Sequence, residues 1–232
     1  EKSDKLKEQL NITEDELESL AAGLMSDYEY DKDARSDWLK SYTDGLDLLG
    51  FKYEDRSKPF AGASGVTHPL LAETVTQFQA QAYKELLPAD GPVRTRIIGV
   101  ETPQKNDQAG RVKEFMNYQL MDVMKEYEPE FDQMLFYLPL SGSAFKKIYY
   151  DDLLGRTVSK FVPADDLIVP YNATNLEDAD SVIHRIKISE NDLRKQQVAG
   201  FYRDIELPKP YSQETEVEKK ERMLDGTKKT YN

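Results

Sequence analysis

The order of the hydrophobic periodicities along this chain constrains its fold more than any other feature. Apolar residues recur every three or four positions through most of the first 138 residues, which is the spacing of one helix face. Stretches rich in β-branched and aromatic residues come mainly after residue 143. Helices and strands therefore do not alternate regularly, as they would around a parallel sheet. The sequence predicts an α+β fold, with several long helices packed against a small, mostly antiparallel sheet.

Residues typical of helix N-termini indicate where the helices begin. Thr13 and Glu16 fit the capping box that opens a helix. Pro69 suits a first helical turn, because its missing N–H would have no intrahelical partner there. The apolar stripe that follows it consists of Leu71, Val75, Phe78, Ala82 and Leu86. Helices are expected over residues 13–25, 28–48, 69–87, 107–127, 129–138, 189–200 and 213–224.

A β-hairpin gives the strongest strand signal. Residues 144–150 and 156–162 carry alternating aromatic, β-branched and charged side chains on either side of a turn at 151–155. Further strands are expected over residues 93–100, 167–169 and 181–189.

The composition excludes several classes of site. The 232 residues include no cysteine, which excludes disulfides and thiolate metal ligands, and the two histidines argue against an imidazole zinc site. A net charge of -12 gives no overall electrostatic attraction for nucleic acid. No apolar run reaches the ~18–20 residues of a membrane helix, and no signal peptide is apparent. We therefore expect a soluble intracellular protein without a metal or cofactor.

Residues 62–65 (GASG), followed by His68, invite comparison with a catalytic serine and its base. A nucleophile elbow needs G-x-S-x-G between a strand and a helix, but here the glycine comes one residue too early and a charged loop precedes it. We interpret Gly62, Ser64 and Gly65 as a bend that delivers the chain into the helix at 69–87, with His68 at its N-cap. These four residues are predicted to form a hinge or a subunit contact.

A second serine motif is weaker still. Ser143 and Lys146 fit the short S-x-x-K pattern, but the S-D-N and K-T-G motifs that accompany it in enzymes are missing. We predict that the protein is not an enzyme. A serine hydrolase that uses Ser64 or Ser143 is the catalytic alternative.

The hairpin carries a basic cluster on an otherwise acidic protein. Its four basic residues, accompanied by acidic residues at 151 and 152, are Lys146, Lys147, Arg156 and Lys160. They are predicted to contact a phosphate backbone or an acidic partner. The alternative is a solvated hairpin with no partner.

Six stretches carry a resemblance to a known family. They are YTDGLDLLGFKYEDR (42–56), PFAGASGVTHPLLAETVTQFQAQA (59–82), GPVRTRIIG (91–99), FMNYQLMDVMKEYEPEFDQML (115–135), LPLSGSAFKKIYYD (138–151) and FVPADDLIVPYNATNLEDADSVIHRI (161–186). Together they resemble, in order from about residue 25 to 205, the N-terminal part of the portal proteins of tailed bacteriophages. The resemblance is to the large portal type of short-tailed phages.

The resemblance implies a structural rather than a catalytic protein. Portal subunits form a ring, expected here to be a dodecamer, at one vertex of the capsid. Double-stranded DNA passes through its channel during packaging and ejection. The implied partners are the major capsid protein, the terminase large subunit and tail adaptor proteins. The implied location is the virion, with assembly in the host cytoplasm.

The resemblance also suggests a domain organisation. Residues 1–26 are expected to form an N-terminal helical arm, residues 27–208 a portal wing-like α+β domain, and residues 209–232 a charged tail that leads to the rest of a longer chain. The helices at 69–87 and 107–127 are expected to supply a rigid wedge for ring contacts. The alternative within the same class is a head–tail adaptor or scaffold-like interaction protein without a channel.

Overall fold

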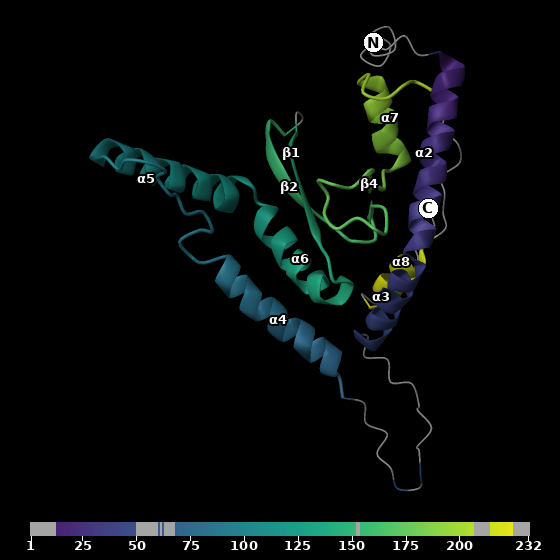
Figure 1. The fold of residues 1–232 in the computed structure, drawn as a ribbon, viewed down its shortest axis with the longest axis horizontal. Helices are drawn as coiled ribbons and strands as arrows, with labels where there is room; N and C mark the ends of the chain where they lie inside the picture. Colours follow the sequence, from purple (N-terminus) through teal and green to yellow (C-terminus); the bar gives the residue numbers. More distant parts are fainter. Residues whose placement is uncertain are drawn as a thin grey trace. The chain divides into compact units, whose positions relative to one another are not determined.

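The structure is a computed structural model, and it describes residues 13–49, 60, 62, 68–151, 154–206 and 214–224. The chain divides into two compact units, one of Glu1–Ser41 with Asp165–Asn232 and one of Tyr42–Ala164. We call them the terminal unit and the central unit. The described residues form helices and two small antiparallel sheets of two strands each, so the predicted α+β fold is confirmed (Figure 1).

Helix α2 (Glu14–Ala34) begins with the predicted capping box. The Thr13 amide donates to Glu16 Oε2 at 2.8 Å, and the Glu16 amide donates back to Thr13 Oγ1 at 3.3 Å. The break expected near residue 26 is wrong. No proline or glycine interrupts the chain there, and α2 continues to the C-cap at Arg35 before α3 (Ser36–Leu49) begins.

Four helical segments follow in the central unit, namely α4 (Leu70–Leu86), α5 (Pro103–Tyr118), η1 (Gln119–Val123) and α6 (Tyr127–Ser141). The helix predicted over 107–127 is therefore two segments, because η1 is a π-helical turn that α5 runs into. Its closing bond runs from the Met124 amide to the Gln119 carbonyl at 3.0 Å. Helix α6 ends at Gly142, whose φ of 78° is readily adopted only by glycine.

The strand predicted over 93–100 is wrong. These residues lie in an irregular segment, and the side chain of Asn117 on α5 satisfies part of its backbone. The Val93 amide donates to Asn117 Oδ1 at 2.9 Å, and Asn117 Nδ2 donates to the carbonyls of Asp90 and Val93 at 3.3 Å. A side chain here makes the hydrogen bonds that a partner strand would otherwise supply.

The predicted hairpin is confirmed as β1 (Phe145–Asp151) paired antiparallel with β2 (Arg156–Val162). Helix α6 lies between this hairpin and α4 (Figure 1). The central unit's buried apolar side chains come from each of these elements, with Val75 on α4, Leu135 on α6, and Val158 and Val162 on β2. Burial of these side chains against one another stabilises the three layers.

The remaining elements belong to the terminal unit. Strand β3 (Leu167–Ile168) pairs antiparallel with β4 (Ile183–His184), so the strand expected over 181–189 is much shorter than predicted. Helix α7 (Glu190–Val198) begins at the predicted Ser189 cap, whose hydroxyl accepts from the Asp192 amide at 3.1 Å. Helix α8 (Glu216–Leu224) lies within the helix expected over 213–224.

Candidate interaction surfaces

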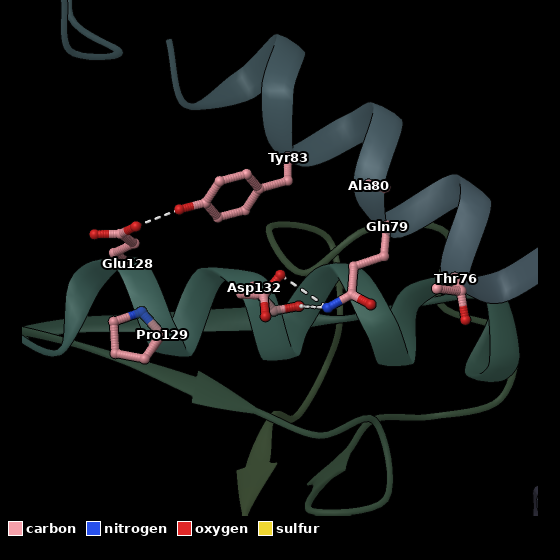
Figure 2. A pocket seen from close by; sticks show the side chains of 7 residues that line it. All are labelled: Thr76, Gln79, Ala80, Tyr83, Glu128, Pro129 and Asp132. Atoms are coloured by element: carbon pink, nitrogen blue, oxygen red, sulfur yellow. Dashed lines mark hydrogen bonds between the residues drawn. The ribbon is translucent and has the colours of Figure 1, made fainter. Parts of the chain in front are cut away.

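A groove lies between α4 and α6 in the central unit. It has a volume of about 560 Å³ and is lined by Thr76, Gln79, Ala80, Tyr83, Glu128, Pro129 and Asp132. Figure 2 shows two polar contacts that join the helices across it. The Tyr83 hydroxyl donates to Glu128, and Gln79 Nε2 donates to Asp132 Oδ1 at 2.8 Å. These contacts fix the separation of the two helices.

Polar side chains that line the groove are engaged in hydrogen bonds within the protein. The hydrogen bond to Glu128 raises the pKa of Tyr83 to about 12, so this phenol keeps its proton at neutral pH. The hydroxyl of Thr76 donates to the Ala72 carbonyl of its own helix at 2.7 Å.

The apolar stripe predicted on α4 is only partly buried. Val75 is fully buried, whereas Phe78 and Leu86 are 40% and 50% exposed. Helix α4 also contacts α6 through hydrogen bonds from the side chains of Gln79 and Tyr83. The sequence could not show this, because polar side chains that pair across a helix contact look like a solvated face.

Helix α5 has no buried residue. Three of its apolar side chains, Val112, Phe115 and Met116, are 46%, 60% and 43% exposed. Their spacing of three and one places them on one face of the helix. We call these three residues the α5 face. A helix that buries none of its side chains in its own unit gains little from tertiary packing.

Basic side chains accompany the α5 face. The segment before α5 lies alongside it, because the Thr95 hydroxyl donates to the Ala109 carbonyl at 3.1 Å. Arg94 and Arg96 on this segment are exposed. On the helix itself, Arg111 is exposed beside Phe115 and pairs with Asp107 at 3.4 Å.

The structure separates the predicted basic cluster of the hairpin into two pairs. In the first, Lys146 lies over the rings of Tyr127 and Phe131, at 3.7 and 4.9 Å from their centroids. Arg156 donates to both oxygens of Glu126 at 2.7 and 2.9 Å. Both side chains therefore make contacts within the protein, and their contact with an external partner stays a prediction.

Burial lowers the pKa of Lys146 to about 8, although the carboxylates of Glu130 and Glu126 act in the opposite direction. The Arg156 hydrogen bonds lower the pKa of Glu126 and hold it as a carboxylate. The Lys146 ammonium also donates to the Tyr127 carbonyl at 3.4 Å. Nearby, the Ser143 carbonyl accepts from the Ser141 hydroxyl.

The second pair, Lys147 and Lys160, face each other across the two strands. Both are exposed, and among the described residues neither pairs with a carboxylate. Like charges directly opposite each other on a hairpin are destabilising. These two lysines remain predicted contacts for a phosphate or an acidic partner.

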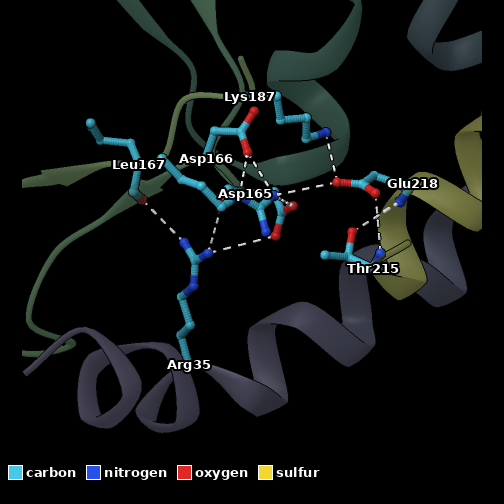
Figure 3. A network of polar contacts seen from close by, with 8 residues as sticks. Arg35, Asp165, Asp166, Leu167, Lys187, Thr215 and Glu218 are labelled. Atoms are coloured by element: carbon cyan, nitrogen blue, oxygen red, sulfur yellow. Dashed lines mark hydrogen bonds and ion pairs between the residues drawn. The ribbon is translucent and has the colours of Figure 1, made fainter. Parts of the chain in front are cut away.

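A network of ion pairs organises the terminal unit (Figure 3). Asp165 is 7% exposed and pairs with Arg185 at 2.7 Å and with Arg35 at 3.6 Å. Arg35 also donates to the carbonyls of Asp165 and Leu167 at 2.6 and 3.1 Å, which ties the end of α2 to β3. Burial lowers the pKa of Arg35. Burial also acts to lower the pKa of Arg185, but the hydrogen bond to Asp166 and the charges of Asp165 and Asp166 together outweigh it and raise that pKa. Each of these charged side chains is therefore paired within the terminal unit.

Helix α8 joins the same network through Glu218. Its carboxylate pairs with Lys187 at 2.6 Å and lies 3.9 Å from Arg185. Burial opposes ionisation of Glu218, but the hydrogen bond from Lys187 lowers its pKa. The Glu218 amide is in turn capped by the Thr215 hydroxyl at 3.3 Å.

The glycine-serine bend is described only in part. Gly62 has a φ of 93°, which fits the predicted bend, while Ser64 and Gly65 lie outside the described residues. His68 is exposed and precedes the N-cap, a position that Pro69 occupies instead. The expectation that His68 caps the helix is therefore wrong. Its carbonyl accepts from the Leu70 amide at 2.8 Å.

No group of three or more potential metal ligands occurs among the described residues, and no described helix is long and apolar enough to cross a membrane. A scan against protein-family models finds no match for the chain, and a search of curated proteins finds none either.

Proposed function

We propose that the chain is a subunit of the phage portal ring, a passive conduit for double-stranded DNA at one capsid vertex. The sequence resemblance that supports this runs in order from about residue 25 to 205. The structural observation that carries it is the α5 face, an exposed apolar surface on a helix with no buried residue. Exposed apolar surface of this kind marks an interface with another protein.

Ring assembly accounts for such a surface. A closed ring requires heterologous interfaces, in which one surface of a subunit fits a different surface of its neighbour. The net charge of -12 also suits a conduit, because an acidic protein does not grip the phosphate backbone as it moves. The terminase would supply the force that moves the DNA. The major capsid protein and tail adaptors are the other proposed partners.

Electron microscopy of the purified full-length polypeptide tests this proposal. We expect rings of twelve subunits with a central channel. Light scattering should give the mass of such a ring. A closed assembly without a channel would favour the adaptor or scaffold reading. A monomer at all concentrations would contradict both.

The catalytic alternative has its own test. A fluorophosphonate probe reacts with activated serines, and we expect no labelling at Ser64 or Ser143. Labelling that disappears in either Ser→Ala variant would overturn the structural reading.

A further inference from the structure

We propose that the α5 face of one copy docks in the α4–α6 groove of the next copy. This inference rests on the proposed ring assembly and names the surfaces that would join its subunits. The apolar residues Val112, Phe115 and Met116 would enter a groove of about 560 Å³ whose partner is otherwise unassigned.

The chemistry of the groove fits a helix with an apolar face. Ala80 lies at its side on α4 and Pro129 on α6, and the ring of Tyr83 spans the space between the helices (Figure 2). A small residue such as Ala80 allows another helix to approach closely. Insertion of an aromatic side chain such as Phe115 into a preformed pocket is a recurring feature of energetically dominant contacts.

Charge complementarity selects α5 as the occupant. The groove lining includes two acidic residues, Glu128 and Asp132, and no basic residue. By contrast, residues 93–118 carry five basic residues against three acidic ones, although the whole chain has a net charge of -12. Opposite potentials on two surfaces steer their association and fix its register.

The positions of the two surfaces require head-to-tail assembly. Both belong to the central unit, where α5 extends away from α4, α6 and the hairpin (Figure 1). Because the surfaces differ, each copy would offer one to each of two neighbours. Repetition of that contact builds a ring when the rotation between copies closes, and an open chain otherwise.

Disulfide cross-linking tests the contact directly, because the chain contains no cysteine. The double variant Phe115→Cys/Ala80→Cys would be oxidised mildly and separated on a non-reducing gel. We expect a ladder of linked species that collapses to one band on reduction. A mixture of the two single variants should give linked dimers and no ladder, since each copy then carries one reactive surface.

The matched control is Glu114→Cys/Ala80→Cys. Glu114 is exposed but lies about 160° around α5 from Val112. This variant should give less than a tenth of the linked product. Circular dichroism and melting temperature of every variant establish that it has folded. A variant that fails to fold is replaced by Met116→Cys paired with Thr76→Cys.

Three results would overturn the inference. A linked monomer would mean that α5 covers the groove of its own chain, and dimers from Phe115→Cys alone would mean that two α5 helices meet. Rings in the microscope without cross-linking of the double variant would reject this contact and leave the proposed function standing. A chain that forms no rings would instead reject the proposed function.

Discussion

Lys146 shows how one side chain can combine packing with charge. Its ammonium lies over the rings of Tyr127 and Phe131, which attract a cation through their π faces. Burial acts in the opposite direction and lowers its pKa from 10.5 to about 8. A residue predicted to contact an external phosphate is thus part of the contact between α6 and the hairpin.

This depressed pKa predicts a rise in stability with pH. Between about 8 and 10.5 the unfolded chain holds a proton on Lys146 that the folded protein has released, so raising the pH favours the folded state. This rise in stability ends near pH 10. Above pH 10 the unfolded chain loses the Tyr83 proton, which the folded protein keeps because its pKa is raised to about 12, so a further rise in pH favours unfolding. We expect the melting temperature of the wild type to rise from pH 8 to 10 relative to that of Lys146→Met. Parallel pH profiles for the two proteins would contradict this assignment.

Asp165 is the residue on which the terminal unit's ion pairs converge. Replacement by alanine would leave Arg35 and Arg185 without their shared carboxylate. We expect a loss of about 1–3 kcal/mol in the free energy of unfolding, because solvent still reaches part of the pair. Urea denaturation measures the loss. The exposed pair of Asp192 and Lys195 provides the control, and Asp192→Ala should have a clearly smaller effect.

At the scale of elements, α6 is the central layer of its unit. It lies between α4 and the hairpin, and its Leu135 is 1% exposed. The ring of Tyr137 on α6 stacks on Phe161 of β2 at 5.7 Å, and Glu130 accepts from the Phe161 amide at 2.7 Å. Loss of packing in this helix therefore affects both neighbouring layers.

The variant Leu135→Ala tests whether α6 forms the core of the central unit. We expect it to lower the free energy of unfolding by about 2–5 kcal/mol, because a fully buried leucine leaves a cavity when truncated. The control is Ile148→Ala on β1, where the side chain is 66% exposed and the expected change is about 0.5 kcal/mol or less. Similar losses in the two variants would show that α6 does not form the core.

The sequence predicts those elements whose signals are local. The capping box at Thr13, the glycine stop at Gly142 and the hairpin turn at Gly155 each involve residues close together in the chain. The strand expected over 93–100 fails because its hydrogen-bonding partner is Asn117, a distant side chain. Propensity alone cannot show which partner a segment will find.

The candidate surfaces, too, can be predicted only as far as their signals are local in the sequence. Helices at 69–87 and 107–127 are predicted as ring contacts from the resemblance, and their apolar residues are visible in the sequence. What the sequence cannot show is which of those residues the fold buries. Val75 is buried whereas Phe115 is 60% exposed, and Gln79 and Tyr83 form hydrogen bonds across the groove to carboxylates on another helix.

At the scale of the whole molecule, the proposed function places every subunit between two neighbours. An aromatic side chain at the centre of an interface typically carries a large share of the binding free energy. A net charge of -12 opposes non-specific association between copies. Assembly should therefore depend on a few apolar positions.

Phe115→Glu tests this dependence. The change would place a carboxylate opposite Glu128 and Asp132, so we expect the dissociation constant between copies to rise at least ~10-fold. Size-exclusion chromatography with light scattering over a concentration series measures it. The same replacement at Val198, which is 90% exposed on α7, is the control. Equal effects at both positions would mean that added charge alone weakens assembly.

The π turn at Gln119–Val123 directly follows α5. A π turn contains one residue more than an α turn. Deletion of that extra residue would restore α-helical winding over the same full rotation and leave the α5 face near its present orientation. Deletion of one residue from regular α-helix would instead rotate the residues before it by about 100°, so these five residues are where the chain can lose a residue and still present the same face.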